Sequence, residues 1–249
     1  MPTLLLEHTP KPGGAGIVGS TLREYGHRLA TIRVAAGEAL PVDLDDVSAI
    51  VLTDGASTLA SPPAWYGPEC ELLKLAQARA IPILGLGLGA RIIAKALGGE
   101  IAPGGDCGWL ECKLAYAGRE DPLYKGVAWS SQQVIWQAES IAKLPEGGVP
   151  LAHAGKPGAK PALRAFSVGV FTFGFEHRFD LDQATFESLL KDRGGEAASL
   201  GGSVDAIRAG WATHGANSQR IGRRIAESVA QFLMPVDRVS AGRIKDLHY

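Results

Sequence analysis

The segment Pro82-Ile83-Leu84-Gly85-Leu86-Gly87-Leu88-Gly89-Ala90-Arg91 decides the fold class of this protein. Within and just before it, Ile81–Leu86 is a short apolar run of the kind that forms a buried strand, and a helical pattern begins after Gly87. Gly98 and Gly99 follow the last apolar residue of that pattern, where a glycine commonly ends a helix. A strand that turns through glycine into a helix is typical of α/β folds, in which ligands bind at the carboxyl ends of strands.

Strand and helix patterns alternate along the first part of the chain. Short apolar runs predict strands at Thr3–Glu7, His27–Val34 and Ser48–Leu52. Amphipathic patterns predict helices near Ile17–Tyr25 and over Pro63–Arg79. Because strands and helices alternate, the sequence predicts an α/β fold with a doubly wound, mostly parallel sheet that is covered by helices on both faces.

The second part of the chain has a different pattern. Strand-like runs follow one another there and predict antiparallel pairing, at Leu110–Tyr116, Gln133–Gln137 and Phe166–Phe175. A helical C-terminal segment is predicted next, with helices at Gln183–Arg193, Ser203–His214 and Ser218–Leu233. Because no repeat or linker interrupts these patterns, we expect one domain over residues 1–235 and a charged tail over residues 236–249.

The composition argues against several classes of protein. The 249 residues include 25 Lys and Arg against 26 Asp and Glu, so a nucleic-acid-binding surface is not expected. No apolar run reaches the roughly 18 residues of a membrane span, and no basic region precedes the apolar N-terminus, so we expect a cytoplasmic protein without membrane contact. Three cysteines are too few for a disulfide framework, and the six histidines lack zinc-binding spacing, so neither a metal nor a cofactor is expected.

The glycine turn at positions 85–90 allows three interpretations. Gly85-x-Gly87-x-x-Ala90 fits the dinucleotide-binding fingerprint, but that fingerprint normally opens the first strand–helix–strand unit, and this turn follows about the fourth strand. The glycines could instead only let the helix pack closely against the strand. In the third interpretation the turn is a nucleophile elbow, which places one residue beside helix N–H groups, with Gly87 in the place of the nucleophile.

The third interpretation gains support from a resemblance. The chain resembles the class I glutamine amidotransferases nearly from end to end, especially the stand-alone, GMP-synthase-type members of about this length. The matching segments are Val51–Gly55 (the oxyanion loop, Gly-Gly-Pro in the family), Pro82–Gly99 (Gly-Ile-Cys-x-Gly-x-Gln to Ala-Leu-Gly-Gly), Asp106–Trp109 (Glu-Ile-Gly-Trp), Leu144–Gly148 (Leu-Pro-x-Gly-Ala) and Gly174–Asp180 (Gly-x-Gln-x-His-Pro-Glu). The resemblance implies a flavodoxin-like, three-layer α/β fold.

The resemblance also implies a chemistry whose residues this sequence lacks. In the family a Cys thiolate attacks the side-chain amide of glutamine, a His transfers the proton, a Glu orients that His, and backbone N–H groups bind the oxyanion. The matching positions here hold Gly87, Arg178 and Asp180. Glycine supplies no nucleophile, and arginine stays protonated and cannot act as a base. His177 lies one position away and is expected to point to the opposite face of its strand.

These substitutions lead to three functional hypotheses. The first is a catalytically inactive protein that acts as a binding or regulatory partner of a synthase or another amidotransferase-family protein. The second is an active amidotransferase or γ-glutamyl hydrolase with a relocated nucleophile, for which Cys107 and Cys112 are the candidates. The third is a sensor of a small anion, a carboxylate or phosphate, in the former active-site cleft. Its candidate ligand-binding residues are Asp54, Gly55, Leu88, Arg91 and Arg178.

The charged residues at these positions also allow a simpler arrangement. Arg91 stands where the family has the Gln of its elbow segment, and Asp54 stands in the oxyanion loop. Arg178 could form internal salt bridges with Asp180 or Asp54 that fill the former cleft. The sequence alone leaves the anion site and the internal salt bridges as alternatives.

Overall fold

The computed structural model describes residues 1–9, 13, 15–155, 158 and 161–236 of the chain. The predicted tail over residues 236–249 therefore lies outside the described residues, except for Val236. The domain boundary at residue 235 stays a prediction.

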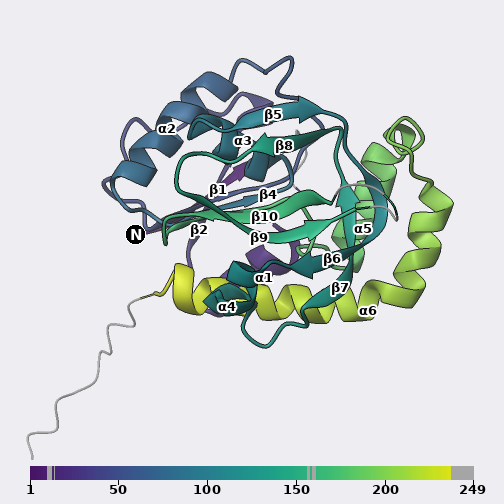
Figure 1. Ribbon diagram of the computed structural model, residues 1–249. Coiled ribbons are helices and arrows are strands. Elements are labelled where there is room, and N and C mark those ends of the chain that lie inside the picture. Colours follow the sequence, from purple (N-terminus) through teal and green to yellow (C-terminus); the bar gives the residue numbers. More distant parts are fainter. Residues whose placement is uncertain (10–12, 14, 156–157, 159–160, 237–249) are drawn as a thin grey trace, which may run out of the picture.

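A nine-stranded sheet forms the centre of the molecule (Figure 1). Its first five strands run parallel to one another, in the spatial order β2 (Leu29–Arg33), β1 (Thr3–Glu7), β3 (Ala49–Leu52), β4 (Ile83–Leu86) and β11 (Thr172–Phe175). The order β2-β1-β3-β4 has its switch point between β1 and β3, as in flavodoxin-like sheets. The predicted α/β fold is confirmed.

The sheet continues beyond β11 as antiparallel strands. They follow in the order β10 (Ala162–Val168), β9 (Gly148–Ala154), β6 (Cys107–Leu114) and β7 (Ser130–Trp136). A separate antiparallel pair is formed by β5 (Glu100–Pro103) and β8 (Glu139–Lys143). The last strand, β7, returns to the segment after β11, where the N–H of Arg178 donates to the carbonyl of Val134 at 2.9 Å. This return holds Arg178 at the carboxyl edge of the parallel strands.

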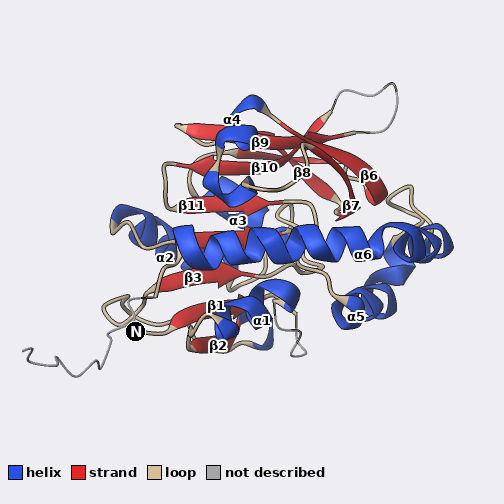
Figure 2. Ribbon diagram, turned by 90° about the horizontal axis from the view of Figure 1, so that it is seen from below, coloured by secondary structure: helices blue, strands red, loops and turns tan. Residues whose placement is uncertain are grey.

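Helices cover both faces of the parallel strands. On one face lie α1 (Gly16–Glu24), α4 (Tyr116–Glu120) and α6 (Val204–Ser228), and on the other lie α2 (Tyr66–Ala78) and α3 (Leu88–Ala96) (Figure 1). Figure 2 shows α6 running across its face of the sheet beside α1, while α5 (Gln183–Arg193) lies near the far end of α6. The molecule therefore has the three-layer arrangement that the sequence predicts.

Successive side chains of β1 point to opposite faces of the sheet, and each face carries its own buried hydrophobic cluster. Leu5 packs in one buried cluster with Val18 of α1 and Ile225 of α6. Leu4 and Leu6 point to the other face and belong to the cluster that α2 and α3 cover. Burial of each such leucine contributes about 1.5–3 kcal/mol, so both faces of the strand favour one register.

Two predicted boundaries are wrong. The helices predicted at Ser203–His214 and Ser218–Leu233 are one continuous helix, α6, which ends in a π-helical turn at Val229–Leu233. The helix runs through Gly215 because that glycine lets the ring of Trp211 pack closely, and one glycine costs a helix only about 1 kcal/mol. The run predicted at Phe166–Phe175 is a hairpin of β10 and β11, and its turn includes Gly169 at φ +61°.

Two further observations concern the described residues. No helix among them is both long and apolar enough to cross a membrane. Nor do three or more His, Cys, Asp or Glu side chains gather there in an arrangement that could hold a metal ion.

Candidate functional site

The chain turns sharply from β4 into α3 at Gly87. This residue has φ +55° and ψ −112°, and its N–H donates to the carbonyl of Phe175 at 2.8 Å. Positive φ is readily adopted by glycine and is strained for other residues. The turn therefore keeps the strand–turn–helix geometry of a nucleophile elbow, with glycine at its apex.

The side chain of Asp54 lies directly over this turn. A Cβ added to Gly87 would come within 2.8 Å of the Cβ of Asp54 and closer still to its carboxyl group. The Oδ1 atom of Asp54 accepts a hydrogen bond of 2.8 Å from the N–H of Leu88, the first residue of α3. A carboxylate is favourable at this position because helix N-termini carry partial positive charge and unpaired N–H groups. The carboxylate thus fills the space over the elbow. It also accepts the hydrogen bond of an N–H group that would otherwise be available to an oxyanion.

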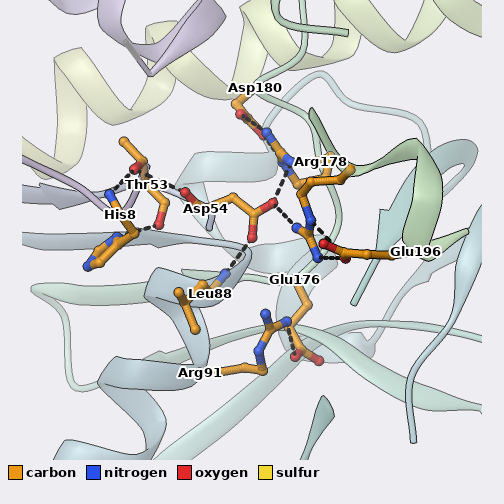
Figure 3. Close-up of polar contacts among 10 residues, drawn as sticks. His8, Thr53, Asp54, Leu88, Arg91, Glu176, Arg178, Asp180 and Glu196 are labelled. Carbon is orange, nitrogen blue, oxygen red and sulfur yellow. Dashed lines mark hydrogen bonds and ion pairs between the residues drawn. The ribbon is translucent and has the colours of Figure 1, made fainter. Parts of the chain in front are cut away.

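Two arginines neutralise this carboxylate through its other oxygen, and Figure 3 labels one of them, Arg178. Arg178 Nη1 and Arg193 Nη1 both donate to Asp54 Oδ2, at 2.7 and 2.9 Å. Arg178 also forms a two-bond contact with Asp180, in which Nε and Nη2 donate to the two oxygens at 2.8 Å each. Arg193 in turn donates to Glu196 at 2.9 Å. The internal salt bridges that the sequence left as an alternative are therefore present.

The pKa values in this network follow from burial and charge. Burial alone would raise the pKa of Asp54, but Arg178, Arg193 and Arg91, with the Leu88 N–H, lower it below its ordinary value. Burial opposes the charge on Arg178 as well, yet Asp180 and Asp54 raise its pKa. Arg178 consequently remains a cation and has no capacity to act as a general base.

Hydrogen bonds from a buried histidine, His8, hold the loop that carries Asp54. The backbone N–H of His8 donates to Thr53 Oγ1 at 3.2 Å, and its ring Nδ1 donates to the Thr53 carbonyl at 2.8 Å. The other ring nitrogen lies 2.9 Å from a carboxylate oxygen of Glu69. A side chain on Gly55 would come within 2.8 Å of His8 and within 3.1 Å of Leu88, so the loop passes close against the start of α3.

A second charged cluster lies beside the first. Arg91 of α3 is 2% exposed, and its Nη1 lies 3.7 Å from Glu176 Oε1 (Figure 3). Arg164 of β10 is fully buried, lies 4.0 Å from Glu176 Oε2 through its Nη1, and donates a hydrogen bond to Asp106 through its Nη2. Glu176 follows β11, and its N–H donates to the Arg164 carbonyl at 2.8 Å.

The structure places the candidate ligand-binding residues together. Asp54, Gly55, Leu88, Arg91 and Arg178 all lie at the carboxyl edge of β3, β4 and β11, around the elbow. Three of them, Asp54, Leu88 and Arg178, hydrogen-bond within the protein. Their role in binding a ligand stays a prediction.

His177 points away from the elbow. Its Nδ1 donates to the carbonyl of Arg164 at 3.1 Å, and its ring packs edge-on against Phe175 and near Phe179. Burial lowers its pKa to about 4. The expected alternation of strand faces thus separates His177 from Gly87.

The two candidate thiols lie in packed surroundings. Cys107 belongs to the buried cluster of Trp136 and Leu181, between β7 and the C-terminal helices. Cys112 is also buried, and burial raises its pKa to about 12. The Cys112 thiol is therefore protonated near neutral pH and is a poor nucleophile.

Arg193, Arg164 and Glu176 are site residues that were not among the candidates predicted from the sequence. Arg193 is the last residue of α5 and lies 139 positions from Asp54 in the chain, so no local pattern connects the two. The matched segment Gly174–Asp180 includes Glu176 at a position where the family has Gln, and that difference was the available signal.

Sequence comparison finds relatives among GMP synthases. The chain is 26% identical over 180 residues to the glutamine-hydrolysing GMP synthase of Pyrobaculum aerophilum, a match that covers 71% of this chain and 34% of that protein. It is 29% identical over 142 residues to a GMP synthase subunit from Archaeoglobus fulgidus, a match that covers 55% of this chain and 69% of that protein. The chain thus spans about a third of the first relative's length. No protein-family model matches the sequence.

Solved structures share the fold over nearly the whole chain. A glutamine amidotransferase from Methylobacillus flagellatus superposes with a TM-score of 0.82 at 17% identity and covers 97% of this chain and 98% of its own. A glutamine amidotransferase from Thermotoga maritima gives 0.78 at 15% identity, over 94% and 99% of the two chains. In fold, in its elbow turn and in sequence, the chain is thus similar to the glutamine amidotransferases. Its elbow has Gly87 at the apex and Asp54 over it.

Proposed function

We propose that this protein does not hydrolyse glutamine and acts as a binding or regulatory partner of a synthase or an amidotransferase-family protein. One observation carries the proposal: the Asp54 carboxylate covers Gly87 and accepts the N–H of Leu88. An acyl-enzyme needs a nucleophile at the elbow and N–H groups that bind an oxyanion. Here the first position has no side chain, and an N–H at the second is already used by a fixed anion.

The charges around the elbow support the same proposal. A general base must accept a proton at working pH, and Arg178 is held as a cation by Asp54 and Asp180. Asp180 gives both of its oxygens to Arg178, so it has no histidine to orient. Nucleophile, base and orienting group are replaced together, as expected for a fold that is kept for binding.

The relatives support a partner of the synthase or amidotransferase class. The Archaeoglobus fulgidus protein is one subunit of a GMP synthase, and the Pyrobaculum aerophilum protein is much longer than its matched region. We infer that this chain associates with a protein of the synthase or amidotransferase class. The expected result of purification from the source cells is a stoichiometric complex with such a protein, and a chain that purifies alone would contradict this part of the proposal.

The direct test of the proposal is an assay of glutamine hydrolysis. The purified protein at high concentration is incubated with L-glutamine, and ammonia and glutamate are measured against a sample without protein. An active glutamine-hydrolysing GMP synthase serves as the positive control. We expect no release above background, and sustained turnover would overturn the proposal.

The same assay, repeated on cysteine variants, distinguishes turnover by a relocated nucleophile from turnover by a contaminating enzyme. If turnover were seen, Cys107→Ser and Cys112→Ser variants would identify a thiol that forms an acyl-enzyme. Loss of turnover in either variant would establish the relocated-nucleophile hypothesis. The burial of both thiols and the raised pKa of Cys112 support the opposite expectation.

A further inference from the structure

Arg91 is a buried cation that lacks ordinary hydrogen bonds. Its side chain is 2% exposed, and its Nε and Nη1 atoms are buried without any hydrogen-bond partner. The nearest carboxylate oxygen, Glu176 Oε1, lies 3.7 Å from Nη1, which is beyond hydrogen-bond distance. Arg91 also lies in the first turns of α3, where the helix dipole disfavours a positive charge.

Arg164 completes a pair of guanidinium groups around the same carboxylate. It is fully buried, and its Nε and Nη1 atoms have no hydrogen-bond partner either. Its Nη1 lies 4.0 Å from Glu176 Oε2, so Glu176 stands between the two arginines and hydrogen-bonds to neither. The side chain of Gln137 lies beside Glu176 as well. We call Arg91, Arg164, Glu176 and Gln137 the arginine cage.

This arrangement is unfavourable for a protein that has nothing to bind there. Buried charges normally have partners at hydrogen-bond distance, since an unpaired donor keeps the full cost of leaving water. The Nε and Nη1 atoms of both guanidinium groups are buried without a hydrogen-bond partner, and both Nη1 atoms lie beside Glu176 beyond hydrogen-bond distance. The neighbouring Asp54 network shows the contrast, because Arg178 and Arg193 satisfy its carboxylate at 2.7 and 2.9 Å.

We propose that the arginine cage binds a small carboxylate anion, with Arg91 and Arg164 donating to its oxygens and Gln137 beside it. Planar guanidinium groups match the two oxygens of a carboxylate. Because the cage is buried, the bound group has few non-hydrogen atoms or is the end of a larger molecule. The inference deepens the proposed function, since a cleft that does not turn over glutamine is free to hold such a ligand as a signal.

The charge balance favours a carboxylate over phosphate. Glu176 and Asp106 already supply two negative charges against the two arginines. A singly charged carboxylate can be accommodated if Glu176 takes up a proton, and burial raises the pKa of Glu176 against the opposing effect of Arg91 and Arg164. A phosphate dianion would bring a second charge close to Glu176, which the cage cannot neutralise.

Thermal unfolding of the full chain tests the proposal. Melting temperatures are measured at neutral pH with increasing sodium acetate, sodium L-glutamate or sodium phosphate, each against sodium chloride of equal ionic strength. We expect a saturable rise of several degrees with acetate, with glutamate or with both, and no specific rise with phosphate. Acetate and glutamate distinguish a bare carboxylate from one carried by an amino acid. No saturable rise with either, or an equal rise with phosphate, would overturn the proposal.

Matched variants connect the response to the cage. Arg91→Gln is expected to remove the carboxylate-dependent rise while the melting temperature without carboxylate stays the same or increases, because the variant removes a buried charge whose Nε and Nη1 atoms form no hydrogen bond. Arg208→Gln removes a surface arginine that is 55% exposed and pairs with Glu187, and it should keep the full response. A response retained in Arg91→Gln, or lost equally in Arg208→Gln, would contradict the assignment. The glutamine hydrolysis assay is independent of this result, so failure of one proposal is distinguishable from failure of the other.

Discussion

The carboxylate of Asp54 lies in the space that any side chain at position 87 would have to enter. The two residues are 33 positions apart in the chain and meet because β3 and β4 are neighbouring parallel strands. Gly87 permits Asp54 to reach the N–H of Leu88, and Asp54 excludes a larger residue at the elbow. Gly87 and the Asp54 carboxylate therefore depend on each other, and together they form the capped start of α3.

This relationship predicts the effect of reintroducing a cysteine. Gly87→Cys should give no glutamine hydrolysis, because Arg178 cannot accept the thiol proton and Asp54 occupies the adjacent space. The variant should also lose stability, by about 1–3 kcal/mol for a non-glycine residue at φ +55° and more from the overlap with Asp54. Urea unfolding and the ammonia assay measure the two effects.

A double-mutant cycle identifies the cause of that lost stability. Asp54→Gly removes the carboxyl group that a Cβ at position 87 would meet. Gly87→Cys should therefore cost less in the Asp54→Gly background than in the natural sequence. Equal costs in both backgrounds would show that backbone strain alone is responsible.

Asp54 should also be a large contributor to stability through its charge. Asp54→Asn keeps an oxygen for the Leu88 N–H but leaves Arg178 and Arg193 facing a neutral group. Removing one partner of a buried ion pair costs about 3–5 kcal/mol. The matched control is Asp45→Asn, because Asp45 forms an exposed pair with Arg79, and it should change the free energy of unfolding little. Similar losses in the two variants would refute the role of the buried network.

The fold was predictable wherever local periodicity dominates. The alternation of buried strands and amphipathic helices up to α3 follows from patterns a few residues long, and Gly98 marks the end of α3 with φ +96°. The prediction missed β5, β8 and β9, which are short or contain proline, as at Pro150. Such strands depend on pairing with distant partners, and sequence periodicity does not contain that information.

The sequence indicated which motif positions to consider, but it did not indicate which charged side chains contact one another. The matched motif segments drew attention to Gly87, Arg178 and Asp180, and in the structure Arg178 contacts both Asp180 and the aspartate that lies over Gly87. Which carboxylate each arginine contacts depends on side-chain packing between distant segments. Arg193 and Arg164 entered the two networks for that reason, without any pattern that marks them in the sequence.

The cysteines give a chemical prediction. Cys112 is buried and its pKa is raised to about 12, while Cys107 is packed beside Trp136. Iodoacetamide at pH 8 should therefore label neither thiol in the folded protein and both in concentrated urea. Mass spectrometry of the peptides gives the extent of labelling at each site. Rapid labelling of Cys107 or Cys112 in the folded protein would revive the relocated-nucleophile hypothesis.

The stability of the protein should decrease between about pH 6.5 and pH 4 because of His177. In the unfolded chain this histidine binds a proton below about pH 6.5, whereas in the folded protein burial lowers its pKa to about 4. A lowered folded-state pKa means that the stabilisation is complete above the unfolded pKa and is lost as the pH falls. The full difference corresponds to about 3 kcal/mol.

His177→Phe isolates this contribution. Phenylalanine suits the aromatic surroundings of Phe175 and Phe179, although it gives up the hydrogen bond to the Arg164 carbonyl. The free energy of urea unfolding is measured from pH 7 to pH 4.5. Its decrease with falling pH should be less steep in this variant, by the equivalent of up to one bound proton. His214→Gln, a change at a half-buried position on α6, is the control for the loss of a histidine outside this aromatic cluster. Asp54 does not confuse the comparison, since its lowered pKa affects stability only below about pH 4. An unchanged slope in His177→Phe would show that His177 is accessible to protons in the folded state, and the assignment of this residue to the closed core would then be wrong.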